Sequence, residues 1–178
     1  MKRQRLYIIS AVLAVALVAA ATAVAGTLTA TATVAGTAGV SLNLPANPSL
    51  SDTLDGTDQT VSYAPVLGVV DARGSGAGWN LQISATAFSD GAGHSLAAGT
   101  VSAAAQACSA GSSCTAAVNS GITLPLTVST TAAKFFNAAL NSGLGKLDVT
   151  PTVQVLIPGN SYAGTYTSTV TLAATTGP

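Results

Sequence analysis

The sequence predicts an all-β protein, an antiparallel β-sandwich of the immunoglobulin-like or jelly-roll-like kind. Apolar and polar residues alternate with a period of two, most clearly from Trp79 to Phe88. Threonine, serine, alanine and glycine are abundant, and glycine or proline interrupts the chain at short intervals. No repeat of roughly 20–50 residues is visible, so we do not expect a solenoid or a propeller.

The first 25 residues have the pattern of a secretory signal peptide. Three cations among the first five residues precede an apolar stretch over 6–20, and Ala23-Val24-Ala25 has the small residues of a cleavage site. We therefore expect cleavage after Ala25 and one secreted domain over residues 26–178. Apolarity continues for about 20 residues, up to Gly26, which is long enough to span a bilayer, so an uncleaved N-terminal membrane anchor is the alternative.

Short strands separated by turns are expected in the first half of the domain, starting with the alternating threonines of 27–34. Residues 40–44 form the next predicted strand, and a turn-rich loop follows. Pro65 lies inside the stretch 60–70, which predicts an edge strand or two short pieces. The clearest strand begins at Trp79, whereas the pattern of 98–107 leaves the type of element open.

The second half begins with a predicted strand over 121–129. One short helix is expected over 131–141, where Lys134, Phe135, Phe136 and Leu140 precede two glycines that would end it. The last two predicted strands cover 147–157 and 165–173. A tyrosine, Tyr162 or Tyr166, is expected to close the end of the core with its hydroxyl bonded to the backbone.

The charges and cysteines narrow the classes of function. After residue 25 the chain has three cations against six aspartates, a net charge of −3. Three dispersed cations cannot form a basic patch, so we expect no nucleic-acid partner. Cys108 and Cys114 are expected to form a structural disulfide, because an exported chain is oxidised and a redox site needs the tighter C-x-x-C spacing.

Residues suited to catalysis or metal binding are few, and we predict neither an enzyme nor a cofactor. Ser89, Asp90 and His94 contain the groups of a Ser-His-Asp triad, but they cluster on a glycine-rich loop that would not orient them. Three aspartates of one loop are weak candidates for calcium, yet aspartates in such runs usually cap turns, so no metal is expected. These weak candidates are Asp52, Asp55 and Asp58.

A glycine-rich turn precedes the clearest strand. Asp71 and Arg73 flank its start and are expected to pair, which would make the turn rigid. Gly74 and Gly78 would supply the backbone freedom that the turn needs. Alternatively, Arg73 is exposed and binds an anionic polymer or stacks on an aromatic ring.

Trp79 has two interpretations. A tryptophan at the start of an alternating strand is usually a core residue. Its large amphipathic ring also suits sugar rings or a protein partner, with Leu81 and Arg73 as the other candidate binding residues.

Three pieces of sequence together resemble the WxL-domain family of exported bacterial cell-surface proteins. They are Asp71-Ala72-Arg73-Gly74, then Gly78-Trp79-Asn80-Leu81, and a C-terminal Gly164-Thr165-Tyr166 strand that ends in Thr176-Gly177-Pro178. The resemblance covers about 58–178. It implies a non-catalytic protein that associates non-covalently with the cell wall, through peptidoglycan or other surface proteins. Trp79 and Leu81 match the family's first W-x-L motif, whereas the place of the second reads Leu172-Ala173-Ala174.

A structural role is the second function that we consider. The uncharged segment 27–34, followed by glycines at 36 and 39, could donate a strand to another subunit and build a surface fibre or matrix. A segment that folds back into its own domain would argue against this role. A segment that extends away and leaves a groove would favour polymerisation.

Overall fold

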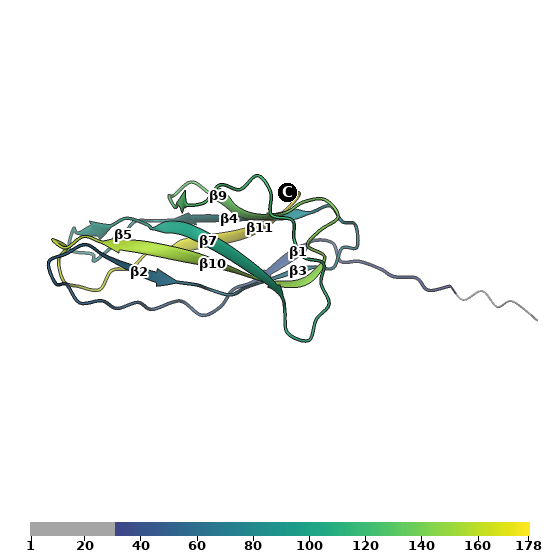
Figure 1. Ribbon diagram of the computed structural model, residues 1–178, viewed down its shortest axis with the longest axis horizontal. Coiled ribbons are helices and arrows are strands. Elements are labelled where there is room, and N and C mark those ends of the chain that lie inside the picture. Colours follow the sequence, from purple (N-terminus) through teal and green to yellow (C-terminus); the bar gives the residue numbers. More distant parts are fainter. Residues whose placement is uncertain (1–30) are drawn as a thin grey trace, which may run out of the picture. The chain divides into compact units, whose positions relative to one another are not determined.

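The computed structural model describes residues 31–178, so the predicted signal peptide lies outside the described residues. Val34–Pro178 forms one compact unit, and the fold described below is that of this unit. Figure 1 shows its strands. Residues 31–178 form strands without an α-helix, and none of them belongs to a helix long and apolar enough to cross a bilayer. The prediction of an all-β fold is confirmed.

Two antiparallel sheets make up most of the unit. The large sheet has the order β1 (Val40–Asn43), β3 (Leu67–Asp71), β10 (Gly145–Ile157), β7 (Thr100–Cys108) and β8 (Leu126–Thr127), and β2 (Gln59–Tyr63) also pairs with β10. The small sheet has the order β11 (Val170–Thr176), β4 (Trp79–Ala85) and β9 (Ala133–Ala138). A two-stranded ribbon joins β5 (Phe88–Ser89) to β6 (Ser95–Leu96).

The long strand β10 organises the large sheet. One of its edges pairs with β3 over 145–149 and with β2 over 153–157, and its other edge pairs with β7. Pro65 lies between β2 and β3, where it separates two strands that follow the same edge of β10. The expectation of two short pieces around this proline is confirmed.

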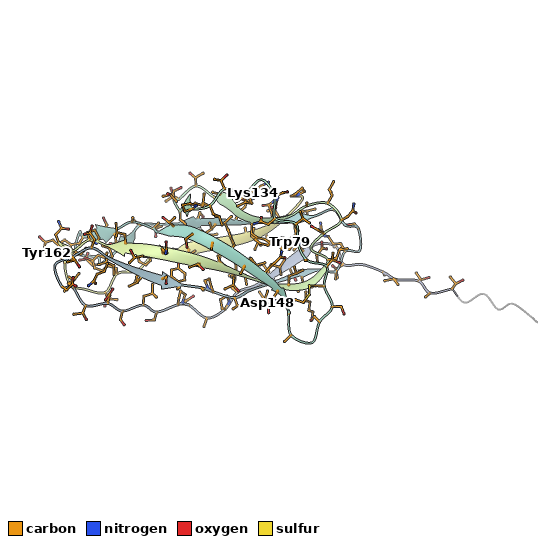
Figure 2. The ribbon with its side chains drawn as sticks, viewed as in Figure 1. Trp79, Lys134, Asp148 and Tyr162 are labelled. Atoms are coloured by element: carbon orange, nitrogen blue, oxygen red, sulfur yellow. A yellow bond between two sulfur atoms is a disulfide. The ribbon has the colours of Figure 1, made fainter. Side chains whose placement is uncertain are left out.

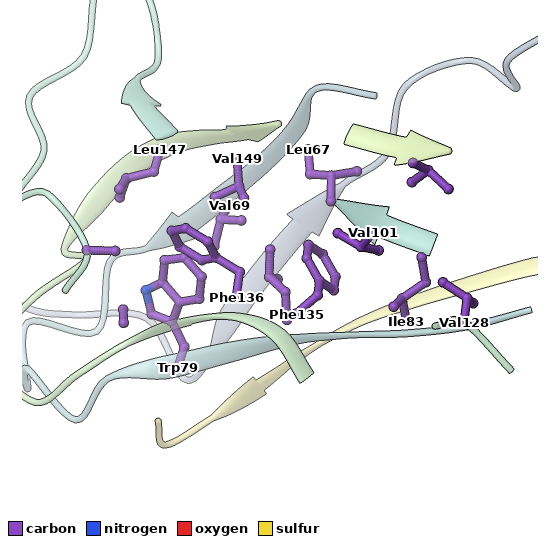
Figure 3. Close-up of a cluster of buried hydrophobic side chains, with 14 of the residues drawn as sticks. Leu67, Val69, Trp79, Ile83, Val101, Val128, Phe135, Phe136, Leu147 and Val149 are labelled. Carbon is purple, nitrogen blue, oxygen red and sulfur yellow. The ribbon is translucent and has the colours of Figure 1, made fainter. Parts of the chain in front are cut away.

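The core lies between the two sheets. Trp79, Leu81 and Ile83 project from β4, and each is at most 2% exposed. They meet buried side chains of the large sheet, as Figure 3 shows for Leu67, Val69, Leu147 and Val149. The predicted alternation along β4 is thus confirmed, and it places the tryptophan inside the protein.

The predicted helix over 131–141 is wrong, because its middle forms β9. Pairing with β4 shifts register between Leu81 and Gln82, so that Phe135 is an extra residue in the ladder. Such a bulge lets two consecutive residues point to the same face, and both Phe135 and Phe136 are buried. Their adjacency breaks the period of two that marks a strand in sequence.

Three predicted strands differ substantially from the structure. Thr27–Ala30 lies outside the described residues, and Thr31–Val34 has no strand and is exposed, so the expectation of a strand over 27–34 is wrong for the part that is described. Within 121–129 only β8 is a strand, since Pro125 cannot donate to a ladder. The last strand begins at Val170 rather than at Thr165, because its partner β4 ends opposite Val170.

The predicted disulfide is confirmed. Cys108 ends β7 and is bonded to Cys114, with 5.6 Å between the two Cα atoms. Cys114 also forms an isolated bridge to Gly145 at the start of β10. The bond therefore holds the short loop between the two cysteines against the large sheet.

Candidate functional site around the buried tryptophan

The indole of Trp79 is enclosed by the protein. The residue is 0% exposed, and its ring stacks on that of Phe136 with 5.8 Å between centroids. Its Nε1–H donates a hydrogen bond of 2.9 Å to the carbonyl oxygen of Gly143. A buried Trp N–H needs such a partner, and the backbone supplies it. No face of the ring is left for a ligand in this conformation.

Asp71 and Arg73 form a buried ion pair at the start of the glycine-rich turn. The guanidinium donates through Nε to Oδ1 and through Nη2 to Oδ2 of Asp71, at 2.8 Å in both cases. The side chain of Asp71 is 0% exposed and that of Arg73 is 7% exposed. Arg73 Nη2 also donates to the Gly78 carbonyl at 2.7 Å. The structure thus shows the paired arrangement of these two residues rather than an exposed arginine.

This pairing changes the acidity of both groups. Hydrogen bonds from Arg73 lower the pKa of the Asp71 carboxyl below its ordinary value, against the opposing effect of burial. Hydrogen bonds to Asp71 raise the pKa of the Arg73 guanidinium. Both groups are therefore held in their charged forms inside the fold.

The two turn glycines differ in what surrounds them. Gly74 and Gly78 have φ angles of 68° and 71°, which L side chains rarely adopt. A Cβ atom at Gly74 would meet open space, whereas one at Gly78 would lie 2.4 Å from the Ala138 carbonyl oxygen. Gly78 is therefore required both by its conformation and by the close approach of β9.

The C-terminal residues close over the same turn. Gly177 N–H donates to the Gly78 carbonyl at 3.1 Å, the oxygen that also accepts from Arg73. The Asn80 side chain donates to the Gly177 carbonyl at 2.8 Å and accepts from the Thr175 hydroxyl at 2.8 Å. The first two pieces of sequence that carry the family resemblance thus converge with Thr176-Gly177-Pro178, the end of the third, and the Gly78 carbonyl accepts hydrogen bonds from both Arg73 and Gly177.

Two residues of this site were missed in the sequence. Asn80 lies on the polar face of the alternating strand, yet it is 4% exposed because the C-terminus covers it. Gly143 was interpreted only as a helix stop, whereas its carbonyl bonds to the indole. Neither role leaves a local signal, because each partner is distant in the chain.

The position of the second motif lies beside the first. Leu172 pairs with Ile83, and Ala174 pairs with Leu81 across β11 and β4. Both β11 residues are partly buried and pack against the core. Leu81 itself is 1% exposed, so the candidate binding residues Trp79 and Leu81 are both core residues.

Replacing Gly143 by alanine should lower the free energy of unfolding. The residue has a φ of 70°, and its Cβ would lie 2.5 Å from Ala138 Cβ and 2.7 Å from the indole nitrogen. Gly74→Ala is the matched control, since it introduces the same backbone strain into open space. We expect Gly143→Ala to cost about 1–3 kcal/mol more than the control in urea unfolding. Equal losses would contradict the close packing of the indole.

Ser89, Asp90 and His94 contain the groups of a triad but do not form a catalytic arrangement. His94 Nδ1 pairs with Asp90, and the imidazole stacks on Tyr162 with 3.8 Å between ring centroids. The hydrogen bond from His94 lowers the pKa of Asp90. The Ser89 hydroxyl accepts from Gly91 N–H, and within the described residues no hydrogen bond joins it to His94. The nucleophile thus has no base oriented toward it.

The three aspartates of the loop before β2 each accept hydrogen bonds from a different residue. Asp55 accepts from the amide and hydroxyl of Thr57, which lowers the pKa of Asp55. Asp58 accepts from Gly159 N–H, and Asp52 accepts from Thr53 N–H. Across residues 31–178 no group of three or more His, Cys, Asp or Glu side chains could hold a metal ion.

Most of the chain matches a known protein family. Residues 31–178 match the family described as "WxL domain surface cell wall-binding". A search of curated proteins and a search of solved structures gave no match. The family match covers most of the chain and includes the turn, the tryptophan strand and the C-terminus described above. The chain therefore belongs to the WxL domain family of surface cell wall-binding proteins.

Proposed function

We propose that the protein is secreted after cleavage following Ala25, and that it associates non-covalently with the bacterial cell wall as a non-catalytic surface protein. The family match over residues 31–178 carries this proposal. Peptidoglycan is the wall polymer that we propose as its partner.

The buried state of the motif affects how such binding would occur. Trp79 and Leu81 are core residues, and the Arg73 guanidinium is already bonded to Asp71 and to Gly78. We propose that these residues support the fold, and that the wall is contacted by exposed parts of the folded unit. A variant that disturbs the motif would then lose wall binding only by unfolding.

Co-sedimentation with purified cell walls tests the proposal. The mature protein, residues 26–178, is mixed with native walls and with walls stripped of their attached polymers by acid. We expect it to sediment with both preparations and to be released by guanidinium, because the association is non-covalent and requires the folded state. Beads of an unrelated insoluble polysaccharide are the control and should bind little.

Each other outcome contradicts a specific part of the proposal. Protein that stays in solution with native walls would contradict wall association. Binding that disappears after acid extraction would contradict peptidoglycan as the partner. Protein that guanidinium does not release would contradict a non-covalent association.

A further inference from the structure

A large cleft opens at the end of the unit where β2 pairs with β10. It has a volume of about 1100 Å³ and lies between these strands, the loop 47–54 and the segment 161–170. Val61, Tyr63, Val155 and Ile157 line it from the large sheet. Tyr162 lies at this end of the compact unit, away from Trp79 (Figure 2).

The cleft lies where the small sheet ends. Strand β11 begins at Val170, which lines the cleft, and the residues before it bond to Thr86 and Ser89 without continuing the strand. The apolar face of the large sheet thus continues past the last residue of the small sheet. Apolar side chains from a further strand beside β2 would extend into the cleft and cover this face.

The edge of β2 beside the cleft is available for pairing. Among the described residues, β2 pairs with β10 alone. An unpaired edge presents backbone N–H and C=O groups to any strand that enters. Asp52 is the only charged residue that lines the cleft, so a strand without charges suits it.

The N-terminal arm, residues 27–38, has the sequence that such a cleft would accept. It is uncharged and alternates threonine with alanine, leucine or valine over 27–34. Its described residues from Thr31 onward have no strand and are exposed, and Val34 is 94% exposed. A β-prone segment with an exposed valine lacks a partner strand within its own described chain.

The arm joins the compact unit far from the cleft. Thr37 N–H donates to the Ala72 carbonyl at 2.9 Å, and a Cβ at Gly36 would strike the Arg73 carbonyl. Asp71, which is next to these residues, lies opposite Gly145 at the start of β10. The cleft is reached further along the same strand, at Val155. Ten residues of strand separate Gly145 from Val155, a distance of about 33 Å.

The arm is too short to fill the cleft of its own copy. A fully extended chain from residue 26 to residue 36 spans at most about 35 Å. The near end of the cleft, at Tyr63 opposite Val153, is about 26 Å along β10 from Gly145. After cleavage following Ala25, most of the arm's length is used up in reaching it, and too few residues remain to fill the cleft. A second copy has no such limit, because its arm can approach the cleft from outside.

We infer that the N-terminal arm of one copy enters the cleft of a second copy and pairs with the free edge of β2. Donor and acceptor lie at different ends of the unit, so the contact is head-to-tail and generates a fibre unless the rotation closes a ring. The inference requires the proposed cleavage after Ala25 but does not require wall binding.

Self-assembly of the mature protein tests the inference. Sedimentation velocity and negative-stain microscopy should show oligomers that lengthen with protein concentration. Val34→Asp should weaken the association at least about tenfold, since it would bury an unpaired carboxylate in the cleft. Val118→Asp is the matched control, because Val118 is 57% exposed and lies outside both the arm and the cleft.

A peptide of residues 26–37 locates the acceptor site. Added to the Val34→Asp protein, it should shift the amide NMR signals of Val61, Val155 and Ile157. The inference would be overturned if the wild type stays monomeric and the peptide causes no shifts at these residues. It would also be overturned if wall glycan fragments, and not the peptide, shift these signals. Val34→Asp should still sediment with cell walls, which separates this inference from the proposed function.

Discussion

Trp79→Ala is expected to lower the free energy of unfolding by about 3–5 kcal/mol. The substitution removes the largest side chain of the core, the stacking on Phe136 and the hydrogen bond to Gly143. A loss of this size is a large fraction of the stability of an ordinary domain. Urea unfolding followed by circular dichroism measures it, because the variant has no tryptophan left to report by fluorescence.

Trp79→Phe is the matched control for this substitution. It keeps an aromatic ring against Phe136 but loses the indole N–H, so we expect a smaller loss than for alanine. A loss below about 1 kcal/mol for Trp79→Ala would contradict a fully packed indole.

Arg73→Ala should have an effect of similar size, about 3–5 kcal/mol. The substitution leaves the Asp71 carboxylate without a partner in a site where its side chain is 0% exposed. It also removes a donor from the Gly78 carbonyl. Urea unfolding at pH 7 measures the loss.

The double variant Asp71→Leu/Arg73→Met is the control for the buried charge. Replacing both partners by apolar groups removes the unpaired carboxylate, so the double variant should be more stable than Arg73→Ala. A double variant that is no more stable than the single one would contradict this explanation.

The same pair predicts how stability depends on pH. Because the fold lowers the pKa of Asp71 below its ordinary value of 3.8, the ionised carboxylate contributes stability above about pH 4. This contribution is lost as the pH falls through the lowered pKa. The part of the acid destabilisation that comes from Asp71 should be absent in the double variant, as urea midpoints between pH 2 and pH 7 would show.

Local sequence patterns were sufficient to predict part of this structure. The alternation after Trp79 defines β4, Pro65 separates β2 from β3, and the spacing of the two cysteines fits their disulfide. Asp71 and Arg73 are two residues apart, so their pairing could also be expected. In each case the interacting residues are near neighbours in sequence, or a single residue type decides the outcome.

Other features depend on partners that are distant in the chain. Phe135 and Phe136 both face the core because β9 bulges against β4, and nothing within the segment 131–141 records that partner. The indole of Trp79 bonds to a carbonyl 64 residues later. The N–H of Gly177, near the C-terminus, bonds to the Gly78 carbonyl in the first half of the chain.

We propose that the tryptophan of the motif supports the fold from inside and does not touch the wall. Trp79 is the only tryptophan in the chain, so its fluorescence reports on this residue alone. We expect emission at short wavelength, protection from quenching by acrylamide, and no change in either when the protein binds purified cell walls. Emission typical of an indole in water, or a shift in emission when walls are added to folded protein, would contradict the claim.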